Sequence, residues 1–145
     1  LKDVIHIGYR WIGNHHRMRI WQEFCLLLGK HLRDATEVDE FYFALLEESS
    51  SKWEVQNPKR IAIEAYIKIL EHEGRLHKEK VCFLCSLKIE KNISLVRSFL
   101  PTHKECSHSF SIDESNFYEL MNNQTTLFLS NAEIDQLWIV LTQGF

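Results

Sequence analysis

Two pairs of metal-ligating residues constrain this chain more than any other feature of its sequence. Cys82 and Cys85 are separated by two residues, and so are His103 and Cys106, with 17 residues between the two pairs. Two intervening residues let one tight turn direct both side chains at one ion, and a spacer of about 15–20 residues lets a second turn complete a tetrahedron. Because thiolates are soft donors that favour zinc over magnesium or calcium, the spacing predicts one structural zinc ion held by these four residues.

The sequence leaves the fourth ligand less certain than the other three. His103 repeats the two-residue spacing, but His108 lies two residues beyond Cys106 and His77 lies five residues before Cys82. Two other interpretations of the cysteines stay open, namely a redox-active pair and thiols that bind no metal. No βαβ pattern surrounds the first pair, as a thioredoxin-like motif would require.

Three cysteines and one histidine fill the coordination sphere of zinc, and such a closed site contributes folding free energy to its segment. A catalytic zinc keeps one position open for water. The zinc deaminase signature combines His-x-Glu with a later Pro-Cys-x-x-Cys, yet here Val81 precedes Cys82 and no His-x-Glu lies upstream in register. The chain also contains no Ser/His/Asp set, no Gly-rich phosphate loop and no paired-carboxylate signature. We therefore expect a protein that is not an enzyme.

Outside the cysteine segment the dominant hydrophobic period is helical. We expect five helices: from about His15 to Leu32, from after Thr36 to about Glu48, from Pro58 to near Gly74, and after capping boxes at Ser111/Glu114 and Ser130/Glu133. The three serines at 49–51 are expected to end the second helix, and Cys25 is expected to be a small core residue of the first. The predicted fold is mainly α, a helical bundle with an inserted zinc knuckle or ribbon.

The domain organisation follows from the same pattern. We expect residues 13–145 to form one helical domain, with the zinc-binding insert at about 78–110. Residues 1–12 are expected to be a remnant or linker of a missing N-terminal domain. No run approaches the roughly 20 apolar residues that cross a bilayer, and charges stand where a signal peptide would be apolar. We expect no membrane association and a cytoplasmic location.

Charge is segregated along the chain. Residues 1–34 carry a net charge of +3 and residues 75–110 a net charge of +4, whereas residues 35–74 and 111–145 each carry −5. A basic surface beside an acidic one can steer an anionic partner to one side of a molecule. The alternative is that the opposite segments pair with each other in the fold.

The order of these features resembles the C-terminal part of the RecO family of bacterial recombination mediators. The most similar stretch is the helix over 60–70, then Gly74, then the first knuckle over 81–85. A second two-ligand knuckle and two capped helices follow. Many members of that family have Cys-x2-Cys as the second knuckle, where this chain has His103-Lys104-Glu105-Cys106, and some members lack zinc.

The resemblance implies a DNA repair function. RecO proteins anneal complementary DNA strands and, together with RecR, help to load recombinase onto DNA that is coated by single-strand-binding protein. They also bind the acidic C-terminal tail of that protein through their helical region, and they carry an N-terminal OB-fold. The resemblance thus implies single-stranded DNA, RecR and the single-strand-binding protein tail as partners.

Several basic residues are candidates for these contacts. Lys30 and Arg33, one turn apart near the end of the first helix, are candidates for the acidic tail, although cations also suit the C-terminal end of a helix dipole. The linker over 75–80 adds further cations. The candidate nucleic-acid-binding residues are Arg10, Arg17, Arg19, Lys88, Lys91, Arg97 and Lys104.

Overall fold

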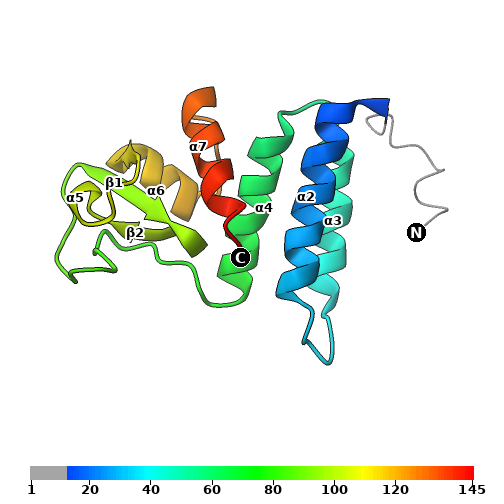
Figure 1. Cartoon of the computed structure of the whole chain (residues 1–145), viewed down its shortest axis with the longest axis horizontal. Helices are drawn as coiled ribbons and strands as arrows, with labels where there is room; N and C mark the ends of the chain where they lie inside the picture. The colour runs from blue at the N-terminus through cyan, green and yellow to red at the C-terminus, as the bar shows by residue number, and fades with distance from the viewer. Residues whose placement is uncertain (1–12) are drawn as a thin grey trace.

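The computed structural model describes residues 13–145 as helices that enclose one core, with a small sheet at one end (Figure 1). The elements are α2 (His15–His31), α3 (Glu40–Lys52), α4 (Pro58–His72), β1 (Asn92–Val96), the 3-10 turn η2 (Arg97–Phe99), β2 (Leu100–Thr102), α5 (Lys104–Ser107), β3 (Ser111–Asp113), α6 (Glu114–Asn122) and α7 (Asn131–Leu141). The prediction of a largely α-helical fold is confirmed. The three-stranded sheet is an addition that helical periodicity did not predict.

The helix α4 lies at the centre of the molecule. It contacts α2 and α3 on one side and α6 and α7 on the other (Figure 1). Tyr66 and Leu70 of this helix are fully buried, and so are Ile63 and Ile67, which point elsewhere on it. A helix that is apolar around most of its circumference must be surrounded, so α4 is the element on which the other helices assemble.

Three helices begin where the sequence predicted, at His15, at Pro58 and directly after Ser130. The side chains of Asn14 and Asn57 accept hydrogen bonds from the first turns of α2 and α4, and Pro58 occupies the first turn of α4. Ser130 and Glu133 form a reciprocal capping box at the start of α7. Each cap pairs backbone N–H groups that have no partner within the helix.

Three predicted boundaries were wrong. The helix α3 begins after Asp39, whose carboxylate accepts from the N–H of Phe41, and it continues through the serines to Lys52. Ser50 and Ser51 donate their hydroxyls to carbonyls one turn earlier, so they are satisfied within the helix instead of breaking it. The cap of α6 is Asp113, because Ser111 belongs to β3.

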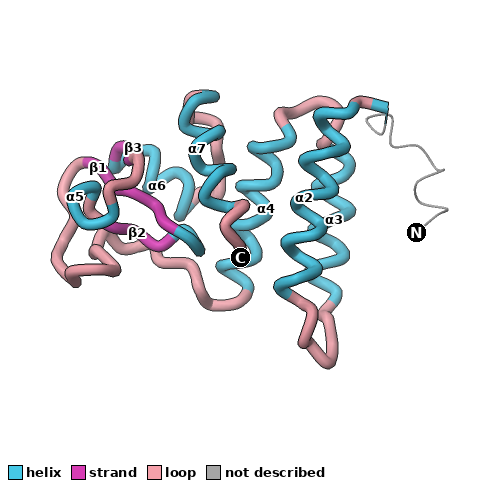
Figure 2. The backbone as a smooth tube through the Cα atoms, viewed as in Figure 1, coloured by secondary structure: helices cyan, strands magenta, loops and turns pink. Residues whose placement is uncertain are grey.

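The sheet has the strand order β2-β1-β3, and both pairings are antiparallel (Figure 2). The central strand β1 buries Ile93, Ser94 and Leu95. Pro101, which lacks an N–H, lies in the edge strand β2, where a missing donor is tolerated. Its carbonyl accepts a hydrogen bond from the N–H of Phe83, so the loop that carries the first cysteine pair adheres to this sheet.

The opposite charge segments do pair across the fold. Lys78 meets Glu71, Lys80 meets Glu114, and Arg75 meets Glu73, so three cations of the basic segment bond to the acidic segments around it. Among the helices of residues 13–145, none is both long and apolar enough to cross a membrane. The predicted remnant of a further domain at residues 1–12 lies outside the described residues.

Candidate metal centre

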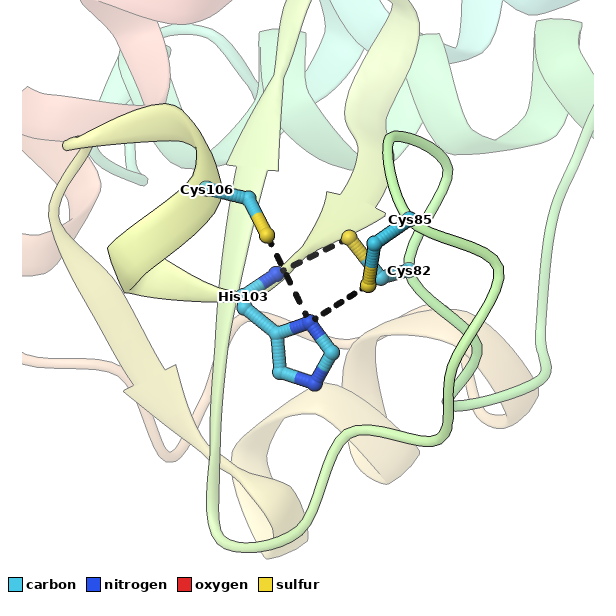
Figure 3. Close-up of side chains that lie close together, drawn as sticks. All are labelled: Cys82, Cys85, His103 and Cys106. Atoms are coloured by element: carbon cyan, nitrogen blue, oxygen red, sulfur yellow. Dashed lines mark hydrogen bonds between the residues drawn. The ribbon is translucent and has the colours of Figure 1, made fainter.

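The structure brings together the four residues that the spacing predicted as metal ligands. The Sγ atoms of Cys82, Cys85 and Cys106 and a ring nitrogen of His103 all lie within 4.8 Å of one another. Figure 3 shows the four side chains pointing toward one another from a loop, from the end of β2 and from α5. Three sulfurs and one imidazole nitrogen in this arrangement could hold a metal ion such as zinc.

Two distances between donor atoms are close to the S–N edge of a zinc tetrahedron. With a Zn–S bond of about 2.3 Å and a Zn–N bond of about 2.0 Å, a tetrahedral S–N edge is about 3.5 Å. Nδ1 of His103 lies 3.3 Å from Sγ of Cys85 and 3.7 Å from Sγ of Cys106. These two S–N separations bracket the expected edge.

The first knuckle is a tight turn that residues 82–87 close on themselves. The N–H of Cys82 donates to the carbonyl of Leu87 at 2.9 Å, and the N–H of Ser86 donates to the carbonyl of Cys82 at 2.8 Å. Ser86 adopts the left-handed conformation with φ 66°, which is uncommon for a residue other than glycine. The turn reverses the chain directly after the second cysteine and leaves both sulfurs on its inner side.

The second knuckle combines the end of a strand with one turn of helix. β2 ends at Thr102, His103 is the cap of α5, and the N–H of Cys106 donates to the carbonyl of His103 at 3.1 Å. His108 ends α5 in the left-handed conformation with φ 56°. A hydrogen bond of 2.8 Å from the Thr102 hydroxyl to Ser107 holds the turn against the strand.

A hydrogen bond outside the cluster fixes the ring of His103. Nε2 lies 2.9 Å from the carbonyl oxygen of Lys88, to which it donates. That bond places the proton on Nε2, leaves the Nδ1 lone pair directed at the sulfurs, and raises the pKa of the ring. Metal-bound histidines usually have such a partner on their second nitrogen.

The thiols of the cluster differ in their ionisation. Burial opposes the thiolate of Cys82, but backbone N–H groups of His103, Cys85 and Leu84 outweigh it and lower its pKa to about 6. Burial, followed by the neighbouring thiols of Cys82 and Cys85, raises the pKa of Cys106 to about 11. Mutual repulsion of thiolates is the feature that a divalent cation at their centre would offset.

The alternative ligands do not reach this cluster. Within residues 13–145, the only group of three or more potential ligands comprises Cys82, Cys85, His103 and Cys106, so neither His108 nor His77 belongs to it. Cys25 lies outside the cluster on α2. It is half-buried and not part of the core, contrary to the prediction, and burial raises the pKa of its thiol to about 11.

The predicted nucleic-acid-binding residues do not form one surface. Lys88 lines a groove with Lys78 and Lys80, whereas Lys91 and Lys104 line another groove beside His103, together with Glu90 and Glu105. Arg97 lies against Gly144 near the end of the chain. Arg10 lies outside the described residues.

The predicted cations of α2 also differ in environment. The guanidinium of Arg17 donates to the backbone carbonyls of Trp53 and Gln56, which joins α2 to the loop after α3. Arg19 is exposed on α2, and Lys30 and Arg33, predicted to meet an acidic tail, are exposed around its C-terminal end. The structure gives Arg17 an architectural contact and leaves the other three accessible.

Sequence reasoning missed the exposed apolar side chains of the first knuckle. Val81, Phe83, Leu84 and Leu87 are all exposed. The sequence could have predicted this exposure, because a six-residue turn is too short to bury apolar side chains inside or beside it. Comparison with protein-family models and with curated proteins gave no match for this sequence.

Proposed function

We propose that the chain is the helical and zinc-binding region of a RecO-like recombination mediator, which binds single-stranded DNA and protein partners and is not an enzyme. In this proposal zinc is structural: Cys82, Cys85, His103 and Cys106 hold it, and it fixes the knuckles against the sheet. The protein partners are RecR and the acidic tail of single-strand-binding protein, for which Lys30 and Arg33 offer an exposed basic site.

The position of the four-ligand cluster supports this proposal more than any other observation. The cluster stands between the helix α4, which is followed by Gly74 in the left-handed conformation, and the two capped helices α6 and α7. That order is the one on which the resemblance to RecO rests. The donor set is closed, since four protein ligands satisfy a tetrahedral zinc ion.

Zinc content and DNA binding test the proposal separately. Elemental analysis of the purified chain is expected to give one zinc per chain. A labelled oligothymidylate is expected to bind at low salt with little preference over other single-stranded sequences, and the affinity is expected to fall linearly on a log–log plot against salt. Undetectable binding at low salt would remove the DNA-binding part of the proposal, whatever the zinc content.

A zinc-stabilised protein-interaction module without DNA binding is the second candidate. The exposed apolar side chains of the first knuckle favour it, because adjacent exposed apolar residues often mark contact surfaces. Capture of an acidic tail would agree with both candidates. DNA binding that weakens as the salt concentration rises would support only the first candidate.

A zinc enzyme is the third candidate, and the closed donor set disfavours it. Replacement of zinc by cobalt distinguishes the cases through the absorption spectrum. A sulfur-rich, four-coordinate cobalt spectrum is expected, whereas a spectrum that responds to added anions would reveal an exchangeable water and an open position.

A further inference from the structure

Two adjoining grooves surround the linker that enters the first knuckle. One groove, of about 480 Å³, lies between this linker and α6, and its lining includes Lys78, Lys80, Lys88 and Tyr118. The other, of about 680 Å³, lies between the linker and the knuckle, and its lining includes His77, Phe83 and Pro101. Lys78, Glu79 and Val81 line both grooves, so the two adjoin along the linker, and we call them together the linker groove.

An exposed aromatic ring lines each part of the linker groove. Tyr118 of α6 exposes 57% of its surface and Phe83 of the knuckle exposes 59%. Aromatic rings that remain open to solvent beside cations are the usual stacking platforms for the bases of single-stranded nucleic acid. The backbone of Phe83 is held by its hydrogen bond of 2.8 Å to Pro101 in β2, so this ring stands on a fixed support.

Three lysines and two glutamates, Glu79 and Glu114, line the part of the linker groove beside α6, which leaves an excess of one positive charge for an anion. Lys88 has no ion-pair partner among the described residues. Lys78 and Lys80 pair with Glu71 and Glu114, but all four side chains are well exposed. Exposed pairs of this kind contribute little, so a phosphate can replace either carboxylate at low cost.

We propose that single-stranded nucleic acid lies along the linker groove, with Lys78, Lys80 and Lys88 meeting phosphates and with Tyr118 and Phe83 stacking on bases. This inference rests on the proposed function and specifies the surface that performs it. It selects Lys88 from the cations that the sequence suggested and excludes Lys104, which lines the separate groove beside His103.

The test is the affinity of purified chain variants for a fluorescent oligothymidylate, measured by anisotropy at low salt. Phe83→Ala and Tyr118→Ala are each expected to weaken binding by about 5- to 100-fold, since each removes one stacking platform. Phe43→Ala and Phe128→Ala are the matched controls, because these exposed rings lie outside the linker groove. Both controls are expected to bind as the wild type does.

A pair of lysine variants tests the phosphate contacts. Lys88→Gln is expected to lower the slope of log affinity against log salt by about 0.7, which corresponds to one phosphate contact on a single strand. Lys104→Gln is expected to leave that slope unchanged. Zinc content and circular dichroism of every variant establish that a lost affinity reflects the surface and not the fold.

The outcomes separate this inference from the proposed function. If the wild type binds but the groove variants and the controls bind equally well, the linker groove is not the site, although the DNA-binding function stands. If the wild type does not bind, the proposed function fails and this inference with it. A third outcome would also overturn the inference. If polyglutamate displaces the oligonucleotide at an equal concentration of charge, and if Phe83→Ala does not change the affinity for the oligonucleotide, the surface binds an acidic protein instead.

Discussion

The helical region and the knuckle region of this molecule are held together by different means. In the helical region, α2, α3, α4 and α7 bury a continuous apolar core that includes Phe24, Trp53 and Tyr66 at 0% exposure. In the first knuckle every residue from Phe83 to Lys88 is exposed, and only Cys82 is buried. Burial of apolar side chains thus explains what stabilises the helical region, but it does not explain what stabilises the first knuckle.

The difference indicates what the cysteines contribute. A short loop buries too little apolar surface to offset the conformational entropy of ordering it, which is about 1–2 kcal/mol per residue for the backbone alone. A metal ion held by the four donors would supply that free energy without an apolar interior. A turn that closes around an ion would also leave side chains such as Phe83 and Leu84 outside, as observed.

Loss of a metal ligand gives the largest expected effect and tests this difference directly. Cys82→Ser is expected to abolish stoichiometric zinc binding and to unfold both knuckles, because structural zinc sites in small modules contribute on the order of 10 kcal/mol. Hydrogen exchange is expected to become fast over 81–88 and 103–108, while α2 and α4 remain protected.

Cys25→Ser is the control for that experiment, since it changes a thiol on α2 that lies outside the cluster. It is expected to keep one zinc per chain and the exchange pattern of the wild type. If Cys82→Ser leaves the knuckles as protected as before, metal is not what holds them, and the contrast between the two regions is wrong.

The second largest effect is expected from the centre of the helical region. Ile67→Ala removes a fully buried side chain from α4 and is expected to lower the free energy of unfolding by about 2–5 kcal/mol. Chemical denaturation measures this loss. Zinc stoichiometry in the absence of denaturant is expected to be unchanged, because no ligand lies on α4.

Leu26→Ala is a suitable comparison, since Leu26 is an exposed side chain of α2 and its truncation is expected to change stability by less than about 0.5 kcal/mol. An equal loss for Ile67→Ala and Leu26→Ala would show that burial does not stabilise this region.

The helical region and the ligand set were the parts that sequence could predict. Periodic apolar residues and side-chain caps are local signals, so α2, α4 and α7 begin where Asn14, Asn57 and Ser130 indicate. Ligand spacing is also local within each knuckle, and the two-residue repeat selected His103 over His108. The serines of α3 failed as a helix stop because hydrogen bonds to the preceding turn satisfied their hydroxyls.

The sheet and the grooves could not be predicted in the same way. β1 pairs with β2 and β3 through strands of only three residues each, which are too short for alternation to appear. The linker groove depends on Lys78 and Tyr118, which are 40 positions apart in the sequence. Such a juxtaposition follows from how α6 packs, and no local pattern encodes it.

Glu73 ends α4 and links it to α2 and α3, and its replacement gives the third prediction. Its carboxylate accepts from the Tyr42 hydroxyl at 2.5 Å, from Arg75 at 2.8 Å, and lies 2.8 Å from Nε2 of His31. Glu73→Gln is expected to lower the free energy of unfolding by about 1–2 kcal/mol at pH 7, because the charge-assisted hydrogen bonds are lost. Thermal denaturation of zinc-loaded protein measures this loss.

The pH dependence of the stability lost in Glu73→Gln is the control for this prediction. Burial opposes the charge of Glu73, but the hydrogen bonds from Tyr42, Arg75 and His31 outweigh it and hold the pKa below its usual range. The contribution is therefore present above the unfolded pKa of about 4.3 and disappears as pH falls through the folded value. The difference in stability between the wild type and Glu73→Gln is expected to shrink as pH falls below the unfolded value, and a difference that stays constant throughout the acid range would contradict this role.

The smallest expected effect concerns the helix that joins the two regions. α7 contacts α4 on one side and β1 and η2 on the other, and Ser130 caps its first turn by accepting from the N–H of Glu133 at 3.1 Å. Ser130→Ala is expected to lower the free energy of unfolding by about 1 kcal/mol, whereas Ser130→Asp keeps an acceptor and most of the stability. Because α7 contacts both regions, Ser130→Ala should lower the free energy of unfolding of the helices and of the sheet by the same amount. Hydrogen exchange measures this free energy in each region separately. If only the helices respond, the sheet and its knuckles form an independent cooperative unit that the metal alone sustains, and the contrast drawn above becomes sharper.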